Sequence, residues 1–480
     1  MIDILKIFSV IVVFYSFLKS FYFIYLFQTK EYRLDRFFSM MREEGLFHVF
    51  YLRMIRLPAK TLRNFLIITI SLILSFCLFL FLEKIAFVIA PLLIIFVPFI
   101  AFSFSLTGVL ITSIPVGYYR KRLIDLAKKD VATSKTVFVG ITGSFGKTST
   151  KDYLYLILSQ KFNVAKTDAN MNTDTGIALS ILKNLGKNTD YFIAEMGAYK
   201  LNEIRKAALI VRPKYGILTG IGNQHLDLFG SKENLLKAKK ELLMALPKDG
   251  KAYVNFDCDG YAKLIKDLKC KVVSYSVSKP ADIFAKKIYI KGGKTIADIV
   301  YKNTVFRLET GLLGYHNISN LLPCIALASD LKVDKKKITE TIKQIRPTVH
   351  RLSIHSGPNQ STILSDAYNS NVDGFIAAIK TGSLFQLKNK YIISRGIIEL
   401  GYEKGQSYKK IVDELKKNDF ILLTIDRLFK KYDKQDRVLY FNKEDRMIRY
   451  LIGKADKNSL IVVEGKFTYE TMQLLTINQI

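Results

Sequence analysis

Two long segments near the N-terminus contain no charged residue, and they constrain the first part of this 480-residue chain more than any other feature. Residues 64–82 are uncharged over 19 positions, and residues 85–119 are uncharged over 35. About 20 consecutive apolar residues can cross the hydrocarbon core of a bilayer as a helix. A buried helical hairpin in a soluble domain is the less favoured alternative. We therefore expect two membrane spans, over about 64–83 and 85–112.

A third apolar segment lies at the start of the chain, over about residues 5–28, and carries Lys19 near its middle. A lysine at the centre of a span costs about 2.5–3.5 kcal/mol on insertion scales. A cleaved signal peptide is disfavoured, because the segment ends in aromatic residues and has no small-residue cleavage site. Residues 5–28 are therefore predicted to form a first span, and the charge of Lys19 is the argument against it.

Basic residues flank the apolar segments and predict their orientation. Residues 29–63 hold eight Lys or Arg against four Asp or Glu, and five more basic residues lie within 120–129. Basic loops of membrane proteins stay on the cytoplasmic side. Everything after residue 120 is therefore predicted to lie in the cytoplasm, at a bacterial inner (cytoplasmic) membrane.

The formal net charge of +30 does not by itself predict a nucleic-acid-binding protein. After residue 130 the lysines are scattered among acidic residues, and no basic run is interleaved with aromatic residues. A lysine-rich surface near anionic lipid headgroups explains the charge better. The four cysteines show neither paired nor metal-binding spacing, which indicates reduced thiols.

A glycine turn between a predicted strand (137–141) and a predicted helix (151–158) is the strongest functional signal. Its sequence is Gly143-Ser144-Phe145-Gly146-Lys147-Thr148-Ser149-Thr150. Backbone N–H groups at such a helix N-terminus converge on phosphate oxygens, Lys147 adds a full positive charge, and Thr148 is placed to bind Mg²⁺. The spacing differs from the standard Walker A motif, because Ile141 stands where its first glycine is expected.

From about residue 133 the sequence alternates strand-like and helix-like segments, which is typical of an α/β domain with a mostly parallel sheet. One predicted strand runs into Glu195, and another is followed within a few residues by His225. Ligand sites in such sheets lie at the carboxyl ends of the strands. We therefore expect Lys147, Glu195 and His225 to share one crevice.

Several motifs occur in one order along the chain: 142–148, 170–176, 195–198, 225–227, 238–241, 314–320, 350–352, 365–371 and 399–401. Their series resembles the Mur ligase family of ATP-dependent ligases, most of all its D-alanyl-D-alanine-adding branch. The resemblance covers roughly residues 135–470. It implies a P-loop-containing central ATP-binding domain over 133–345, with a mostly parallel sheet, and a Rossmann-like α/β C-terminal domain over 346–480. An α-helical transmembrane region over 1–120 precedes them.

The resemblance also implies the chemistry. ATP converts a carboxylate into an acyl phosphate, and an amine then displaces phosphate to form an amide. Cations must hold the negative charge that passes among crowded oxygens. Lys147 and Thr148 would hold the phosphates and one Mg²⁺, while Glu195 and His225 would hold a second Mg²⁺.

Further site residues follow from the same resemblance. Lys239 matches a lysine that CO₂ converts into a carbamate, another oxygen ligand for Mg²⁺, and Lys240 is the competing candidate. The turn residues implied to bind ATP are Gly143, Ser144, Gly146, Lys147, Thr148 and Ser149. Four later residues match positions that contact the nucleotide in the family: Asn317, Asn320, Arg351 and Asp366.

The chain departs from the family pattern where substrates bind. Membrane spans replace the soluble domain that holds a UDP-sugar, and residues 396–401 and 463–467 differ on the amine side. The predicted function is a membrane-anchored Mg-ATP-dependent amide ligase. It would join the peptide carboxylate of a UDP-linked or lipid-linked wall precursor to an amine, with D-Ala-D-Ala as the default. The alternatives are a ligase for another polymer, such as poly-γ-glutamate, and a catalytically silent nucleotide-binding scaffold at the membrane.

Overall fold

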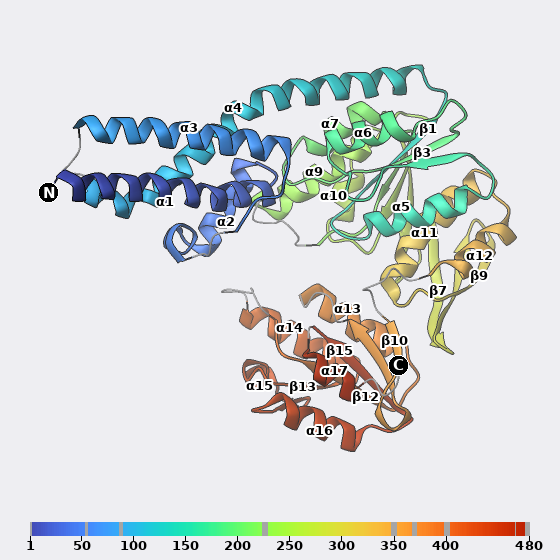
Figure 1. Ribbon diagram of the computed structural model, residues 1–480. Coiled ribbons are helices and arrows are strands. Elements are labelled where there is room, and N and C mark those ends of the chain that lie inside the picture. Colours follow the sequence, from blue (N-terminus) through green and yellow to red (C-terminus); the bar gives the residue numbers. More distant parts are fainter. Residues whose placement is uncertain are drawn as a thin grey trace. The chain divides into compact units, whose positions relative to one another are not determined.

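The computed structural model describes residues 2–52, 56–85, 90–222, 229–346, 353–366, 372–397, 404–465 and 467–475. The chain divides into two compact units. The first comprises residues 1–130 with 199–201 and 224–235, and the second comprises the remainder. The first 130 residues form helices, whereas the second unit combines sheets and helices (Figure 1).

Three long helices dominate the first unit: α1 (Ile2–Thr29), α3 (Leu62–Ile85) and α4 (Ala90–Thr133). The short helix α2 (Leu34–Glu44) and the π-helical turn η1 (His48–Leu52) lie between α1 and α3 in the sequence. Three stretches are long and apolar enough to cross a membrane: Ser9–Thr29, Leu62–Leu82 and Ile94–Thr133. Helix α4 is continuous, contains Pro98 and Pro115, and extends beyond the predicted third span.

Aromatic side chains form the core of the first unit. Phe27 of α1 stacks on Phe37 of α2 with ring centroids 4.5 Å apart, and Phe37 lies 5.5 Å from Phe102 of α4. Lys19 lies inside this unit as well, with 2% of its surface exposed and its Nζ 4.9 Å from the centre of the Tyr22 ring. The ammonium charge of Lys19, which is the argument against the first span, therefore lies inside the helical bundle.

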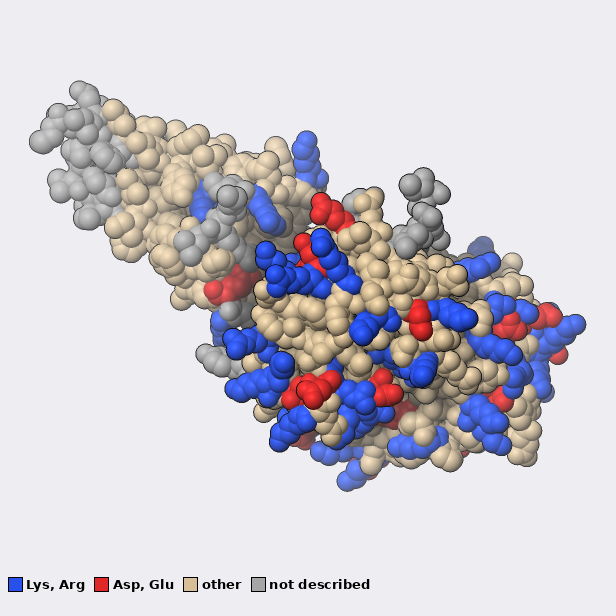
Figure 2. Space-filling model, turned by 90° about the horizontal axis from the view of Figure 1, so that it is seen from below, with Lys and Arg blue, Asp and Glu red and all other residues tan. Residues whose placement is uncertain are grey.

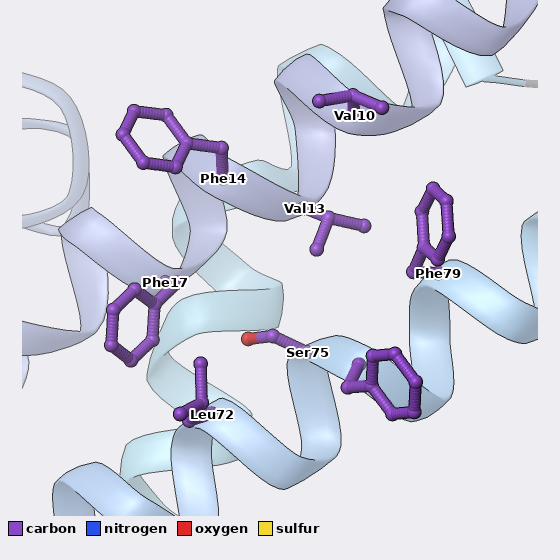
Figure 3. Close-up of a pocket in the computed structure, with 8 residues that line it drawn as sticks. Val10, Val13, Phe14, Phe17, Leu72, Ser75 and Phe79 are labelled. Atoms are coloured by element: carbon purple, nitrogen blue, oxygen red, sulfur yellow. The ribbon is translucent and has the colours of Figure 1, made fainter.

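A hollow of about 330 Å³ lies between α1 and α3. Figure 3 shows apolar side chains of both helices around it. Ser75 contributes the hydroxyl in its lining, and that hydroxyl already donates to the Ser71 carbonyl at 2.8 Å. This lining suits hydrocarbon rather than a charged nucleotide. The lining residues are Val10, Val13, Phe14, Phe17, Leu72, Ser75, Phe76 and Phe79.

Residues 199–201 belong to the first unit and contact α2. The guanidinium of Arg36 lies 4.0 Å from the centre of the Tyr199 ring, a cation–π contact. Asp35 pairs with Lys200 at 3.3 Å and with Arg33 at 2.8 Å. The hydrogen bond from Arg33 is the main reason that the pKa of Asp35 is held well below its usual range.

A nine-stranded sheet organises the first half of the second unit, in the order β2-β3-β1-β4-β5-β6-β7-β8-β9. It is parallel from β2 to β7 and antiparallel from β7 to β9. Strand β1 is buried along nearly its whole length, as expected for a central parallel strand. The strands are β1 (Val137–Thr142), β2 (Val164–Lys166), β3 (Tyr191–Glu195), β4 (Tyr215–Leu218), β5 (Lys251–Asn255), β6 (Lys271–Ser276), β7 (Ile283–Lys291), β8 (Lys294–Tyr301) and β9 (Thr304–Thr310).

Helix α11 is the most buried of the helices that accompany this sheet, and its apolar residues join the main core. Asp330 at its C-terminal end accepts hydrogen bonds from the hydroxyls of Tyr253 and Tyr301 and pairs with Lys251, each at 2.8 Å. This cluster ties α11 to β5 and β8. The helices are α5 (Lys147–Leu158), α6 (Asp174–Asn184), α7 (Glu203–Val211), α9 (Lys232–Met244), α10 (Tyr261–Ile265), α11 (Tyr315–Asp330) and α12 (Lys335–Gln344).

A six-stranded sheet organises the C-terminal half, in the order β10-β11-β15-β12-β13-β14. Only β10 is antiparallel to its neighbour, so the predicted mixed α/β fold with mostly parallel sheets is confirmed. The strands are β10 (Ser353–Ser356), β11 (Thr362–Asp366), β12 (Asn389–Ser394), β13 (Ile421–Thr424), β14 (Val438–Tyr440) and β15 (Ser459–Glu464). The helices are α13 (Val372–Ser383), α14 (Lys404–Lys417), α15 (Leu428–Tyr432), α16 (Glu444–Lys454) and α17 (Tyr469–Leu475), with a 3₁₀ turn η2 (Pro358–Gln360).

Charged side chains are unevenly distributed over the chain. Figure 2 shows basic and acidic side chains interspersed on one face of the molecule, whereas much of the helical region is uncharged. On that face the basic side chains are therefore spread over the surface rather than gathered in one groove.

Candidate active site

The glycine turn leads from β1 into α5, and two of its positions require glycine. A Cβ atom on Gly143 would lie 2.0 Å from the hydroxyl oxygen of Thr219, which is too close for any side chain. Gly146 has a φ of 82°, in the left-handed region, and a Cβ there would lie 2.3 Å from Oδ1 of Asn320. Glycine therefore permits both the turn and the close approach of α11.

Hydrogen bonds fix the turn to the segments that follow β3 and β4. The Ser144 N–H donates to the Gly220 carbonyl at 2.7 Å, and the Thr219 hydroxyl donates to the Phe145 carbonyl at 2.5 Å. On the other side, the Thr142 hydroxyl donates to the Met196 carbonyl at 2.8 Å. The turn is therefore held from both neighbouring strands.

The register of the sheet explains this arrangement. Strand β1 lies between β3 and β4, with Ile141 opposite Glu195 and Thr142 opposite Leu218. The carboxyl ends of three adjacent strands meet at the glycine turn, and binding sites of open α/β sheets lie at such ends. Lys147 and Glu195 are close enough for their charges to interact.

Lys147 is the first residue of α5, and its side chain folds back onto the glycine turn. Its Nζ donates to the carbonyls of Gly143 at 2.8 Å and Ser144 at 3.0 Å. Burial lowers the pKa of its ammonium, and the charge of Glu195 opposes that effect. The amine therefore lies where phosphate oxygens would meet the turn.

Glu195 is a buried carboxylate with 3% of its surface exposed. Asn172 donates its Nδ2 to Oε1 at 3.1 Å. Lys151 places its Nζ 3.2 Å from Oε2, close enough for an ion pair, although Oε2 accepts no hydrogen bond of good geometry. A buried carboxylate oxygen of this kind retains coordination capacity for a cation.

Lys239 lies on α9 with 3% of its surface exposed. Burial is the main cause that lowers the pKa of its ammonium to about 7, and the positive charge of Lys147 adds to the effect. A neutral amine is the form that can attack CO₂. The neighbouring Lys240 instead donates its Nζ to the Lys263 carbonyl at 3.0 Å.

The two asparagines of α11 play different parts. Asn317 accepts a hydrogen bond from the Tyr153 hydroxyl and donates one to the Leu313 carbonyl, each at 2.8 Å, so its carboxamide braces α11 against α5. Asn320 is the one that lies against Gly146.

Three predicted site residues have less structural description. His225 and Arg351 lie outside the described residues. Asp366 ends β11 opposite Glu464 of β15, and the structure describes its backbone alone. Within the described ranges, no three His, Cys, Asp or Glu side chains cluster as a metal site.

The described residues nevertheless fit a divalent cation. Mg²⁺ prefers oxygen ligands and is usually held by one or two carboxylates together with substrate phosphates. Glu195 supplies a buried carboxylate oxygen that lacks a hydrogen bond, and Thr148 is exposed in the first turn of α5.

Two residues at this site escaped prediction: Lys151 and Asn172. Lys151 follows Lys147 by four positions and precedes Leu154 and Leu158 by three and seven, so all four share one face of α5. That spacing was the available signal. Asn172 lies in a loop within the motif 170–176, which is part of the family resemblance, but no role is predicted for it.

Comparison with known proteins identifies the family. Residues 141–328 match the Mur ligase middle domain, and residues 350–467 match the Mur ligase, glutamate ligase domain. A UDP-N-acetylmuramoyl-tripeptide–D-alanyl-D-alanine ligase of Buchnera aphidicola is 30% identical over 69% of this chain and 72% of its own length. The chain belongs to the Mur ligase family.

Other Mur ligases support this assignment. The UDP-N-acetylmuramoyl-tripeptide–D-alanyl-D-alanine ligase of Bacillus subtilis is 27% identical over 72% of this chain and 76% of its own length. MurF from Acinetobacter baumannii has the same fold, with a TM-score of 0.60 at 22% identity over 74% of this chain and 78% of its own. MurF from Thermotoga maritima, solved with ADP, has a TM-score of 0.59 at 22% identity over 74% and 82%.

The predictions of a Mur ligase and of an ATP-dependent ligase are therefore confirmed. Mur ligases use ATP and Mg²⁺. The family matches begin at residue 141, so the helices of the first unit lie outside them. The individual site residues remain predictions, and the structure gives the placement of those that lie within the described residues.

Proposed function

We propose that this chain is a membrane-anchored Mg-ATP-dependent ligase that extends the peptide of a cell-wall precursor with an amine, D-Ala-D-Ala being the first candidate. The names of its relatives supply the substrate class. One observation carries the proposal: the glycine turn that Lys147 contacts and the buried carboxylate of Glu195 lie at the carboxyl ends of the adjacent strands β1 and β3. Catalysis of acyl phosphate formation needs such fixed charges where negative charge develops.

Each residue has a proposed task. The backbone N–H groups of the glycine turn and the ammonium of Lys147 bind the phosphates of ATP, and Lys147 exchanges two carbonyl partners for phosphate oxygens. Thr148, Glu195 and His225 would hold Mg²⁺, which neutralises phosphate charge when bound. Asn320, Arg351 and Asp366 would contact the nucleotide.

Lys239 would act as a carbamate. Addition of its neutral amine to CO₂ forms an N–C bond, turns one C=O bond of CO₂ into C–O⁻ and releases one proton from nitrogen, so a neutral group becomes an anion beside the metal ligands. Its burial and its pKa of about 7 favour this reaction at Lys239.

The apolar helices suggest where the reaction takes place. Three stretches have the length and composition of membrane spans, and the segments between and after them are rich in Lys and Arg. The positive-inside rule then favours catalytic domains in the cytoplasm at the inner membrane. Anchoring favours a precursor near the bilayer, either lipid-linked or UDP-linked.

A substrate screen tests this function. The full-length chain in detergent micelles receives Mg-ATP, a UDP-linked or a lipid-linked muramoyl tripeptide, and D-Ala-D-Ala, D-Ala, glycine or L-glutamate. We expect ADP release that requires both a muramoyl acceptor and D-Ala-D-Ala. Release with glutamate alone would instead indicate the poly-γ-glutamate type of ligase, and no release with any pair would indicate a silent scaffold.

A further inference from the structure

A second lysine of α5 reaches the buried carboxylate that the proposed function assigns to the metal. Lys151 is among the largest fully buried side chains of the described residues, with 2% of its surface exposed. Its Nζ lies 3.2 Å from Oε2 of Glu195, whose side chain is 4% exposed. Lys147, one turn earlier, is directed to carbonyls of the glycine turn instead. Lys151 is therefore the cation nearest Glu195 among these lysines.

The two oxygens of Glu195 are held differently. Oε1 accepts a hydrogen bond from Asn172 at 3.1 Å, whereas Oε2 faces Lys151 without a well-formed hydrogen bond. Asn172 thus fixes the carboxylate through one oxygen. Lys151 compensates the charge at the other oxygen by proximity, which leaves the lone pairs of Oε2 available.

A divalent cation would approach this same oxygen. A lysine ammonium and a metal ion near one carboxylate repel each other strongly in a buried site. Without any cation, however, a buried carboxylate is strongly destabilising. Before the metal binds, the site therefore needs a positively charged side chain near Oε2. After the metal has bound, the positive charge from the protein side chain should be weaker.

We propose that Lys151 is a positioning residue that neutralises Glu195 and fixes its carboxylate until a divalent cation takes that place. The inference rests on the proposed function, since it takes Glu195 as a metal ligand. A lysine with a purely structural role would stabilise the protein equally with and without metal. By contrast, a lysine that neutralises Glu195 in place of the metal stabilises the metal-free protein and opposes metal binding.

The test measures thermal unfolding of the full-length chain in detergent, with and without MnCl₂ and without nucleotide. Lys151→Met should unfold at a lower temperature than wild type when no metal is present. Mn²⁺ should then raise its melting temperature more than that of wild type. The Mn²⁺ dissociation constant, from the signal of free Mn²⁺ in electron paramagnetic resonance, should be lower by about tenfold or more. Equal Mn²⁺ responses in the two proteins would overturn the inference.

Two further variants sharpen the result. Lys151→Met/Glu195→Gln removes both charges, so it should recover the metal-free stability and lose the Mn²⁺ response. If Lys151→Met alone fails to fold, this double variant decides: a folded protein supports the unpaired charge as the cause, and an unfolded one contradicts it. Lys166→Met is the matched control, because Lys166 pairs with Asp152 of α5 in a partly exposed bridge at 2.7 Å. Its Mn²⁺ response should equal that of wild type.

The proposed function and this inference can fail separately. Absence of ADP release by the wild-type chain would count against the function. The inference depends on the metal response of stability, which requires neither ATP nor precursor.

Discussion

Lys239 combines a functional role with a cost in stability. Its ammonium has a pKa of about 7 in the folded chain, against about 10.5 in the unfolded chain, because burial disfavours the charge. Between these values the unfolded chain binds the proton and the folded chain does not, so stability rises with pH from about 7 to 10.5. An uncharged side chain of similar length would remove this penalty.

Lys239→Met should therefore raise the melting temperature at pH 7 in CO₂-free buffer and flatten its dependence on pH above 7. The gain in the free energy of unfolding is on the order of a few kcal/mol. The same variant should lose ligation, measured by ADP release. Lys240→Met serves as the control and should retain both activity and pH dependence. Full ligation by Lys239→Met would refute the carbamate.

The sequence predicts the location of residues that the order of strands and helices determines. It does not predict contacts that depend on how side chains pack in three dimensions. Lys147 and Glu195 follow strand ends, and parallel strands carry such ends to one edge. Lys151 escaped because a lysine on a helix normally faces solvent, and its burial depends on a carboxylate 44 positions later. The bracing role of Asn317 depends on Tyr153, 164 positions earlier, which no local pattern reveals.

The attachment of helix α11 to the sheet depends on a single carboxylate at the C-terminal end of the helix. Asp330 lies at the C-terminus of the helix, where the helix dipole disfavours negative charge. Burial also raises its pKa, but hydrogen bonds from Lys251, Lys302, Tyr253 and Tyr301 outweigh both effects and lower the pKa to about 2. The folded chain thus stabilises the ionised form, and this stability is complete above about pH 4 and is lost as pH falls toward 2.

Asp330→Asn should lower the free energy of unfolding at pH 7 by about 2 kcal/mol, because charged hydrogen bonds to two lysines are lost. The loss should shrink below pH 4, because the unfolded wild-type chain then takes up a proton at Asp330 before the folded chain does. Denaturant unfolding at pH 7 and pH 3 measures both effects. Asp298→Asn breaks an exposed pair with Arg307 and should change stability far less. Similar losses of unfolding free energy in the two variants would contradict the proposal that Asp330 stabilises the fold through its cluster of hydrogen bonds.

The whole chain combines a catalytic part that has its own cores with a helical part that lies outside the family matches, which begin at residue 141. Three described cores around the nine-stranded and six-stranded sheets contain only residues after 138. Helix α4 ends at Thr133 and β1 begins at Val137, so a cut between them removes no strand. The apolar helices are therefore expected to serve location rather than the stability of the sheets.

Removal of residues 1–134 should give a soluble protein that unfolds cooperatively and releases ADP with a UDP-linked acceptor. In lipid vesicles, the full-length chain should exceed this fragment on a lipid-linked acceptor by at least about tenfold, since anchoring raises the effective substrate concentration. Size-exclusion chromatography, thermal unfolding and ADP release measure these outcomes. An aggregated fragment would show that the helices contribute to the fold, and equal rates on the lipid-linked acceptor would remove the anchoring advantage.

The lysines around Glu195 have a practical consequence for handling the enzyme. Two lysine side chains, Lys147 and Lys151, lie near the single carboxylate of Glu195, so the site favours the binding of an anion. Sulfate, citrate and polyphosphate in purification buffers will compete with the nucleotide for this site. Affinities for ATP measured in phosphate buffer will therefore underestimate those measured in chloride of equal ionic strength.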